Sequence, residues 1–299
     1  MESKRRAGAF CRDTAALAKR LELRQGDLVF LPNLSLPDVL ALARYFRSNN
    51  ESAGPSWHLL FRRDARYTED DRRDPLTASG RIRASLKELC ASLAGQRVGL
   101  YTDTDRLTAQ YNGLEVATFS TLCIPVNPAI GPNPNRSLDR PLQIAYLGDA
   151  RREKGYQLLP DLVEELRDRY LAAGRIRFLI QSNLPRGVAD PVILRARTSL
   201  RNHDPSHVQL IETPLDPSDY EHAMAESDVI VLPYDPERYQ ARSSGVFAEA
   251  LSAAIPVLVP EGTWMSAQLS SSRANDVQET RGVAYARDPG SFLSNLLDG

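Results

Sequence analysis

The sequence predicts an α/β protein of two domains, each built on a parallel β-sheet. Short apolar runs alternate with amphipathic stretches along the chain, which is the pattern of strand–helix–strand units. The segment Asn127–Pro141 has four prolines, one glycine and little apolar content, and it divides this pattern into residues 1–126 and 142–299. We therefore predict an interdomain linker there. The length of 299 residues suits two domains of modest size.

The first predicted domain, residues 1–126, begins with a charged helix and then alternates strands and helices. Its expected strands are short and apolar: Leu28–Leu31, Trp57–Phe61 and Val98–Tyr101. Its expected helices are Asp13–Leu23, Pro37–Arg47, Ile82–Leu93 and Asp105–Tyr111. The charged run Arg62–Asp74 shows no periodicity, so we expect a solvated loop there.

The second predicted domain, residues 142–299, repeats the alternation with longer helices. Its expected strands are Leu142–Leu147, Ile176–Ile180, Val208–Ile211, Asp228–Leu232, Val257–Val259 and Val283–Tyr285. Its expected helices are Leu158–Tyr170, Val192–Leu200, Pro217–Ala225, one that begins near Ser244 and ends before Pro256, and Gly290–Leu297. The segment Leu158–Tyr170 has the strongest apolar face, so we expect it to cover the sheet.

Composition and charge argue against several classes of function. The chain has 42% hydrophobic and 25% charged residues and a formal net charge of −1, which gives no general reason to expect nucleic acid as a partner. The cysteines Cys11, Cys90 and Cys123 are scattered without a metal-binding spacing, which indicates a reducing compartment. The histidines are scattered too, so we expect no metal site. No apolar run is long enough to span a membrane, and we expect a cytoplasmic protein whose Arg-rich surfaces could touch the inner face of the membrane.

The segment Arg242-Ser243-Ser244-Gly245 lies directly before a predicted helix and has the chemistry of a phosphate site. The first N–H groups of a helix are unpaired and the helix dipole places positive charge there, so this end attracts anions. Ser243 and Ser244 offer hydroxyl groups, Gly245 permits close approach of a ligand, and Arg242 adds a fork of donors. An ordinary turn with Ser244 as the N-cap is the alternative interpretation.

Glu249 lies one turn further along the same predicted helix. Its carboxylate could accept hydrogen bonds from the hydroxyl groups of a sugar. A solvated helix residue without a ligand is the alternative.

Three polar loops follow predicted strands of the second domain: Gly148–Gly155, Gln181–Asn183 and Tyr234–Ser244. Ligands of open α/β sheets bind at the carboxyl ends of the strands, where these loops should meet. The loops also carry cations, namely Arg151, Arg152, Lys154, Arg238 and Arg242. Cations and a helix N-terminus on one edge suit an anionic diphosphate. A solvated edge is the alternative interpretation.

These motifs resemble those of retaining glycosyltransferases of the GT-B architecture, in the large family 4 group. The resemblance covers about Leu142–Leu297 and, more weakly, Gly26–Val126. The segment YLGDARREKG is similar to the family's strand and following loop, in which Gly148, Lys154 and Gly155 match the family's spacing. Asp149 departs from the pattern, because the family has an arginine directly after the first glycine; Arg151 or Arg152 could replace it.

The segment SSGVFAEALSAAIPVLV, from Ser243 to Val259, resembles the family's donor-binding helix. Glu249 matches the second of two glutamates that the family carries eight positions apart, and Ala241 stands at the place of the first. The sequence Arg-Ser-Ser-Gly is similar to that of a bacterial subgroup. The resemblance implies two Rossmann-like domains, of which the first is shortened because no glycine-rich loop follows an opening strand.

The resemblance implies a metal-independent retaining hexosyltransferase that moves a sugar from a nucleotide diphosphate sugar to an acceptor hydroxyl, in polysaccharide or glycan biosynthesis. It assigns Lys154 and Arg152 to catalysis and Glu249 to the ribose. The diphosphate-binding residues that it implies are Arg151, Arg152, Lys154, Arg242, Ser243, Ser244 and Gly245. It implies no cofactor and no metal, a glycan, lipid-linked or small-molecule acceptor, and a homo-oligomer or partner subunit that completes the short first domain.

Other functions remain open. A catalytically degenerate GT-B protein that binds a nucleotide sugar or acts as a scaffold is the main alternative, and an epimerase or a phosphorylase on the same architecture is a third. A nicotinamide-dependent enzyme is disfavoured, because no G-x-G-x-x-G follows a strand. In the first domain, Thr102, Asp103 or Asp105 could touch a ligand, although we favour Asp103 as a helix cap. We expect His58 to be a packed histidine.

Overall fold

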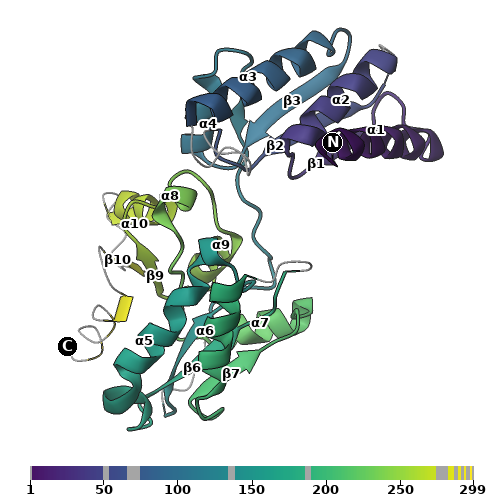
Figure 1. Ribbon diagram of the computed structural model, residues 1–299. Coiled ribbons are helices and arrows are strands. Elements are labelled where there is room, and N and C mark those ends of the chain that lie inside the picture. The colour runs from purple at the N-terminus through teal and green to yellow at the C-terminus, as the bar shows by residue number, and fades with distance from the viewer. Residues whose placement is uncertain are drawn as a thin grey trace. The chain divides into compact units, whose positions relative to one another are not determined.

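The structure is a computed structural model that describes residues 2–49, 54–65, 75–133, 139–185, 190–273 and 282–285, together with positions 289, 290, 293 and 297. The chain forms two compact units (Figure 1). Unit 1 comprises Met1–Cys123 and the short segment Ala241–Ser243, and unit 2 comprises Ile124–Gln240 and Ser244–Gly299. Each unit is built on its own parallel sheet, so the predicted α/β class is confirmed.

Unit 1 carries a four-stranded parallel sheet in the order β1-β2-β3-β4. Its elements are α1 (Glu2–Arg20), β1 (Leu28–Leu31), α2 (Leu36–Ser48), β2 (Ser56–Phe61), α3 (Pro75–Ala91), β3 (Arg97–Thr102), α4 (Asp105–Asn112) and β4 (Ser120–Thr121). Each strand lies beside the strand that precedes it in the chain. Because such connections are right-handed, the helices of this unit come to one face of the sheet.

The core of unit 1 lies on that helix-covered face. Trp57, Leu59 and Phe61 of β2 pack there with buried residues of α2, α3 and α4. Side chains alternate along a strand, so the β1 residues paired with Ser56 and His58 point to the opposite face. These residues are Leu28 and Phe30, which are 63% and 43% exposed. The described part of unit 1 therefore leaves this face exposed at β1, and we call this part, at Leu28 and Phe30, the open sheet face; Leu60 of β2, on the same side, is buried.

Unit 2 carries a six-stranded parallel sheet in the order β10-β9-β8-β5-β6-β7. Its strands are β5 (Leu142–Tyr146), β6 (Ile176–Gln181), β7 (Val208–Ile211), β8 (Val229–Val231), β9 (Val257–Pro260) and β10 (Gly282–Tyr285). Its helices are α5 (Leu159–Leu166), α6 (Pro191–Arg201), α7 (Pro217–Glu226), α8 (Pro236–Tyr239), α9 (Gly245–Ser252) and α10 (Trp264–Arg273).

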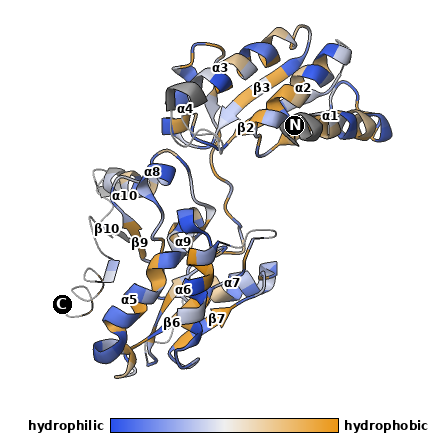
Figure 2. Cartoon of the chain, in the orientation of Figure 1, coloured by the Kyte–Doolittle hydropathy of each residue, from blue (hydrophilic) through white to orange (hydrophobic). Residues whose placement is uncertain are grey.

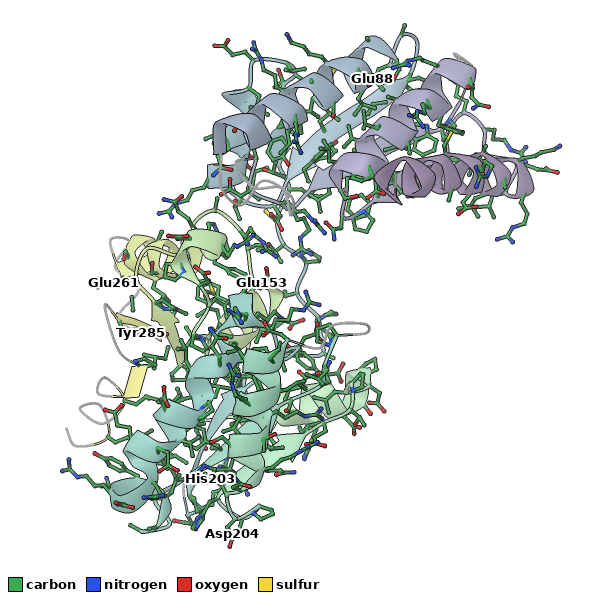
Figure 3. The ribbon with its side chains drawn as sticks, in the orientation of Figure 1. Glu88, Glu153, His203, Asp204, Glu261 and Tyr285 are labelled. Atoms are coloured by element: carbon green, nitrogen blue, oxygen red, sulfur yellow. The ribbon has the colours of Figure 1, made fainter. Side chains whose placement is uncertain are left out.

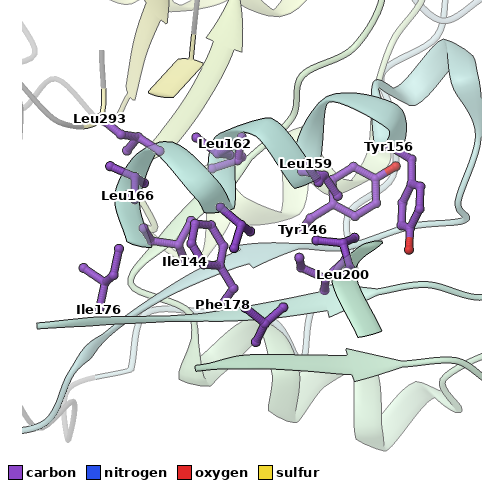
Figure 4. Close-up of a cluster of buried hydrophobic side chains, with 14 of the residues drawn as sticks. Ile144, Tyr146, Tyr156, Leu159, Leu162, Leu166, Ile176, Phe178, Leu200 and Leu293 are labelled. Carbon is purple, nitrogen blue, oxygen red and sulfur yellow. The ribbon is translucent and has the colours of Figure 1, made fainter. Parts of the chain in front are cut away.

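The sheet of unit 2 is covered on both faces. Ile144 and Tyr146 of β5 point into a cluster formed with α5 and α6 (Figure 4). Ala145 and Leu147 point the other way, into a cluster formed with α7, α9 and α10. Burial on both sides explains why β5 is a continuous apolar run. Among the labelled strands of unit 2, β9 is largely orange in Figure 2.

Most predicted elements are present with shifted ends. The helix expected over Leu158–Tyr170 ends as an α-helix at Leu166 and continues as a π-turn, Arg167–Leu171. The helices α8 and α10 were not predicted, and α1 and α3 begin earlier than expected. Most of the helix expected over Gly290–Leu297 lies outside the described residues. No helix among those described is long and apolar enough to cross a membrane.

Two predicted loops differ from expectation in their packing. Ile130, in the predicted linker Asn127–Pro141, is 5% exposed and belongs to the core of unit 2. At the start of the charged run, Asp64 and Ala65 are buried and hydrogen-bond to Gln110 of α4. These residues are therefore packed rather than solvated, while residues 66–74 lie outside the described part.

A buried ion pair joins the beginnings of β5 and β8. Arg140 Nη1 donates to Asp228 Oδ2 over 2.7 Å, and the backbone N–H of Gln143 donates to the same oxygen over 2.6 Å. The Asp228 side chain is 6% exposed and that of Arg140 is 21% exposed. Removing the carboxylate charge would leave a largely buried guanidinium and an amide without a charged acceptor.

We expect Asp228→Asn to lower the free energy of unfolding by about 2 kcal/mol, because a buried charge-assisted hydrogen bond is lost. The measurement is urea denaturation followed by far-UV circular dichroism. The matched control is Asp168→Asn, whose side chain is 89% exposed and pairs with Arg167. The control should change stability by less than about 0.5 kcal/mol; equal losses in both variants would contradict the assignment of a buried ion pair.

Candidate functional site

The strand order of unit 2 brings the three polar loops together. The sheet runs from β5 through β6 in one direction and from β5 through β8 in the other. This reversal is the topological switch point, where α/β proteins bind ligands beyond the carboxyl ends of the strands. Backbone hydrogen bonds join the loops: Ala150 N–H to Asn183 C=O at 2.9 Å, and Asp235 N–H to Glu153 C=O at 3.0 Å. Glu153, whose carbonyl group accepts the second of these bonds, is labelled in Figure 3.

Two glycines shape the loop after β5. Gly155 has a left-handed φ of 71°, and a Cβ built on it would overlap the carbonyl group of Pro233. Gly148 has a φ of 132°, and a Cβ there would come within 2.8 Å of Lys154 Nζ. The Lys154 ammonium thus lies beside the backbone of Gly148 and 5.8 Å from the centroid of the Tyr234 ring. Gly155 thus lets the loop approach Pro233, and Gly148 leaves room for the Lys154 ammonium.

Asp149 holds Arg151. Their side chains form an ion pair, and Asn183 Nδ2 donates to the other carboxylate oxygen over 2.7 Å. Burial raises the pKa of Asp149, but the hydrogen bond from Asn183 and the positive charges of Arg151 and Lys154 outweigh it, so the net shift is downward. The carboxylate is thus charged at neutral pH. Arg151 consequently lies next to the position where the family pattern has its arginine.

Arg152 points to a different partner. Its Nε and Nη2 donate to the two oxygens of Asp190, each over 3.0 Å. Asp190 is the N-cap of α6 and also accepts from Val192 N–H. The Arg152 side chain is exposed to solvent and that of Asp190 is partly exposed. Arg152 is therefore paired at the start of α6.

Ser244 caps α9. Its Oγ accepts a hydrogen bond from Phe247 N–H over 3.2 Å, as the simpler of the two sequence interpretations expects. Gly245 is the first helical residue, and a Cβ there would meet nothing within 4 Å. Ser243 differs, because it belongs to the short segment of unit 1 and donates to Asp103 Oδ2 over 2.5 Å. Arg242, also in that segment, is half-buried.

Glu249 is held by a residue that the sequence did not indicate. Tyr220 of α7 donates its hydroxyl hydrogen to Glu249 Oε2 over 2.6 Å. The glutamate is therefore not simply a solvated helix residue. No local pattern could have shown this contact, because the two residues lie on different helices.

Unit 1 carries a polar cluster of its own at the carboxyl ends of β2 and β3. Arg62 Nε donates to Asp103 Oδ2 over 2.6 Å, and Arg62 Nη2 approaches Ser243 Oγ at 3.2 Å. Asp103 is 5% exposed, and its Oδ1 has no hydrogen-bond partner among the described residues. The expectation that Asp103 caps a helix is wrong, because Thr104 Oγ1 accepts from Leu107 N–H and is the N-cap of α4.

His58, predicted to be a packed histidine, is partly buried and contacts Tyr101. Its ring stacks on Tyr101 with centroids 5.6 Å apart, and its Nδ1 lies 3.1 Å from the Tyr101 hydroxyl group. Across the described residues, no group of three histidine, cysteine, aspartate or glutamate side chains has the geometry of a metal site.

Solved structures of trehalose-6-phosphate synthases have a similar fold. The enzyme from E. coli, bound with UDP-2-fluoro glucose, aligns over 97% of this chain and 69% of its own with a TM-score of 0.63 and 14% identity. The enzyme from Burkholderia xenovorans, in complex with glucose-6-phosphate, aligns over 97% and 69% with a TM-score of 0.64 and 12% identity. The enzyme from Burkholderia vietnamiensis aligns over 96% and 70% with a TM-score of 0.62.

This likeness shows the fold, which is that of GT-B glycosyltransferases with parallel-sheet α/β units. No protein-family profile matches the sequence. No curated protein is significantly similar to it in sequence.

We expect Gly155→Ala to lower the free energy of unfolding by about 3 kcal/mol, because the methyl group would collide with Pro233 and alanine is strained at this φ. The measurement is urea denaturation. Gly174→Ala is the matched control, since Gly174 has a φ of 64° with nothing within 4 Å of a built Cβ. The control should cost only about 1 kcal/mol; an equal loss in both would show that the contact with Pro233 is unimportant.

Proposed function

We propose that the protein is a glycosyltransferase that moves a sugar from a nucleotide diphosphate sugar to an acceptor hydroxyl with retention of configuration. The observation that carries this proposal is the placement of Lys154 beside Gly148 at the switch point of unit 2. A cation next to a glycine backbone at this edge suits a diphosphate. The fold supports the proposal, since it is shared with enzymes that have been crystallised with a nucleotide sugar.

The diphosphate contacts in this proposal come from Lys154, Arg151, the backbone at Gly245 and the residues Arg242, Ser243 and Ser244. Arg151 is the better replacement for the family arginine, because its side chain is paired with Asp149, the residue at the place of that arginine. Arg152 is already paired with Asp190. A catalytic role for Arg152 therefore requires that this exposed ion pair open, which costs little in water.

The mechanism proposed is electrostatic. As the bond between the sugar and the diphosphate breaks, positive charge develops on the sugar ring and negative charge on the departing diphosphate. Lys154 and Arg151 would stabilise the negative charge in place, and such preorganised stabilisation is the main source of rate enhancement in many enzymes. Glu249 would accept hydrogen bonds from the ribose. The proposed reaction involves no metal and no cofactor.

The substrates are proposed from chemistry and from the neighbours. A UDP-hexose is the first donor to test, because a neighbour was solved with UDP-2-fluoro glucose. A small sugar or sugar phosphate is the first acceptor, because another was solved with glucose-6-phosphate. Glycan and lipid-linked acceptors, a role in polysaccharide biosynthesis, membership of the family 4 subgroup and a location in the cytoplasm remain part of the proposal.

The test is a thermal-shift screen of the full chain with UDP, GDP, ADP, TDP and their sugars. A ligand that binds the folded state raises the melting temperature. We expect Lys154→Ala to weaken binding of the preferred nucleotide by at least about tenfold, because a charge-assisted contact is lost. Lys87→Ala, on the exposed side of α3, is the control and should bind like the wild type.

Three outcomes have distinct meanings. Binding that depends on Lys154, together with sugar transfer or hydrolysis, supports the enzyme. Binding that depends on Lys154 without turnover favours the main alternative, a degenerate protein that keeps the nucleotide-sugar site. Unchanged affinity in Lys154→Ala would remove this lysine from the diphosphate site.

We also propose that the open sheet face of unit 1 is covered by another polypeptide, either a second copy of the chain or a partner subunit. Parallel sheets are covered on both faces, and the described residues leave Leu28 and Phe30 exposed on one. β1 is also an edge strand of the sheet, and unpaired edges favour association. The hypothesis of a second copy of the chain is tested first, because it requires no other protein.

We expect the wild type to be dimeric by light scattering coupled to size-exclusion chromatography, and Phe30→Asp to be monomeric because a charge on the apolar face is costly to bury. Leu194→Asp, at an exposed leucine of α6 in unit 2, is the control and should remain dimeric. A wild type that stays monomeric at high concentration would exclude the second copy and leave the partner subunit.

A further inference from the structure

A hydrogen bond joins α7 to α9, and its acceptor is Glu249, the candidate ribose-binding residue. Tyr220 Oη donates to Glu249 Oε2 over 2.6 Å, within the range of a charge-assisted hydrogen bond. The Tyr220 ring is half-buried and packs against the cluster that contains Phe247 and Ala250 of α9. Packing thus fixes the ring, and the ring fixes the position of the hydroxyl group.

The phenol acts as the donor in this pair. Burial raises the pKa of Tyr220, and the hydrogen bond to Glu249 and the negative charge of Glu249 raise it further. The hydroxyl group therefore keeps its proton at neutral and mildly alkaline pH. The hydrogen bond therefore runs from the phenol of Tyr220 to the Glu249 side chain.

This bond restricts a flexible side chain. A glutamate has three rotatable bonds, and ordering them costs about 1 to 2 kcal/mol in conformational entropy. A carboxylate held before a ligand arrives avoids part of that cost on binding. Among the described residues, Glu249 Oε1 has no hydrogen-bond donor, so this oxygen is available to a ligand.

We propose that Tyr220 is a positioning residue, which holds Glu249 for the vicinal hydroxyl groups of the donor's ribose and makes the site select ribonucleotides over 2′-deoxyribonucleotides. The inference rests on the proposed function. Two neighbouring hydroxyl groups can both donate to a fixed carboxylate, whereas a 2′-deoxy sugar leaves one acceptor site unmatched. A site built to accept a hydroxyl hydrogen rejects the analogue that lacks it.

The experiment uses the full chain and the nucleoside diphosphate that stabilises it in the thermal-shift screen, compared with its 2′-deoxy counterpart by isothermal titration calorimetry. If UDP is that nucleotide, the probes are UDP and 2′-deoxyuridine diphosphate. The wild type should bind the ribonucleotide more tightly. Tyr220→Phe should weaken ribonucleotide binding about fivefold, the effect of one hydrogen bond, and weaken deoxyribonucleotide binding less, because only one hydroxyl group of that ligand contacts Glu249.

Two further variants make the test specific. Glu249→Gln should lose the same discrimination, and adding Tyr220→Phe to it should cost little more, because both changes remove one interaction. Tyr111→Phe is the matched control: it removes a buried hydroxyl whose hydrogen bond to the Arg63 carbonyl is 3.1 Å long, in unit 1. This control should change stability without changing nucleotide discrimination.

The outcomes separate this inference from the proposed function. If the wild type binds a ribonucleotide and Tyr220→Phe keeps its full discrimination, Tyr220 is only a packing residue and the function stands. If the wild type prefers the 2′-deoxy form, the ribose assignment is wrong while nucleotide binding stands. If the wild type binds no nucleotide, both proposals fall.

Discussion

The close approach of Gly155 to the Pro233 backbone is the constraint on which the site in unit 2 depends. Only a residue without a side chain can take this left-handed φ and lie against the end of β8. The approach lets the loop after β5 and the loop after β8 share a hydrogen bond, from Asp235 N–H to the Glu153 carbonyl. Lys154 lies between these two anchored residues, so its backbone position is fixed on both sides.

Acidic side chains decide how the cations of this edge are oriented. Asp149 pairs with Arg151, and Asp190 pairs with Arg152 at the start of α6. Where the family has an arginine, this chain therefore has Asp149, an acid that pairs with the arginine two positions later. The positive charge beside Gly148, where a diphosphate would need it, comes from the Lys154 ammonium. Because Arg151 pairs with Asp149 and Arg152 pairs with Asp190, only Arg151 is proposed to replace the family arginine.

The two sheets differ because their strand orders differ. In unit 1, each strand lies beside its predecessor, so the described helices share one face and Leu28 and Phe30 are exposed on the other. In unit 2, the order reverses at β5, so helices cover both faces and the loops after β5 and β8 meet. The reversal that buries the second sheet also creates the edge that binds ligands in such folds.

The sequence by itself determined the local elements and the glycine–lysine spacing of the loop after β5. The strands Leu28–Leu31 and Val208–Ile211 have the predicted bounds, because a continuous apolar run between polar turns is a local signal. α8 was missed because four residues carry no periodicity, and α10 because its serines obscure an apolar stripe. Only the tertiary structure decided which polar groups meet. Tyr220 and Glu249 are 29 positions apart, and Arg62 and Asp103 are 41 apart. Such pairs depend on strand order and helix packing, which no local pattern encodes.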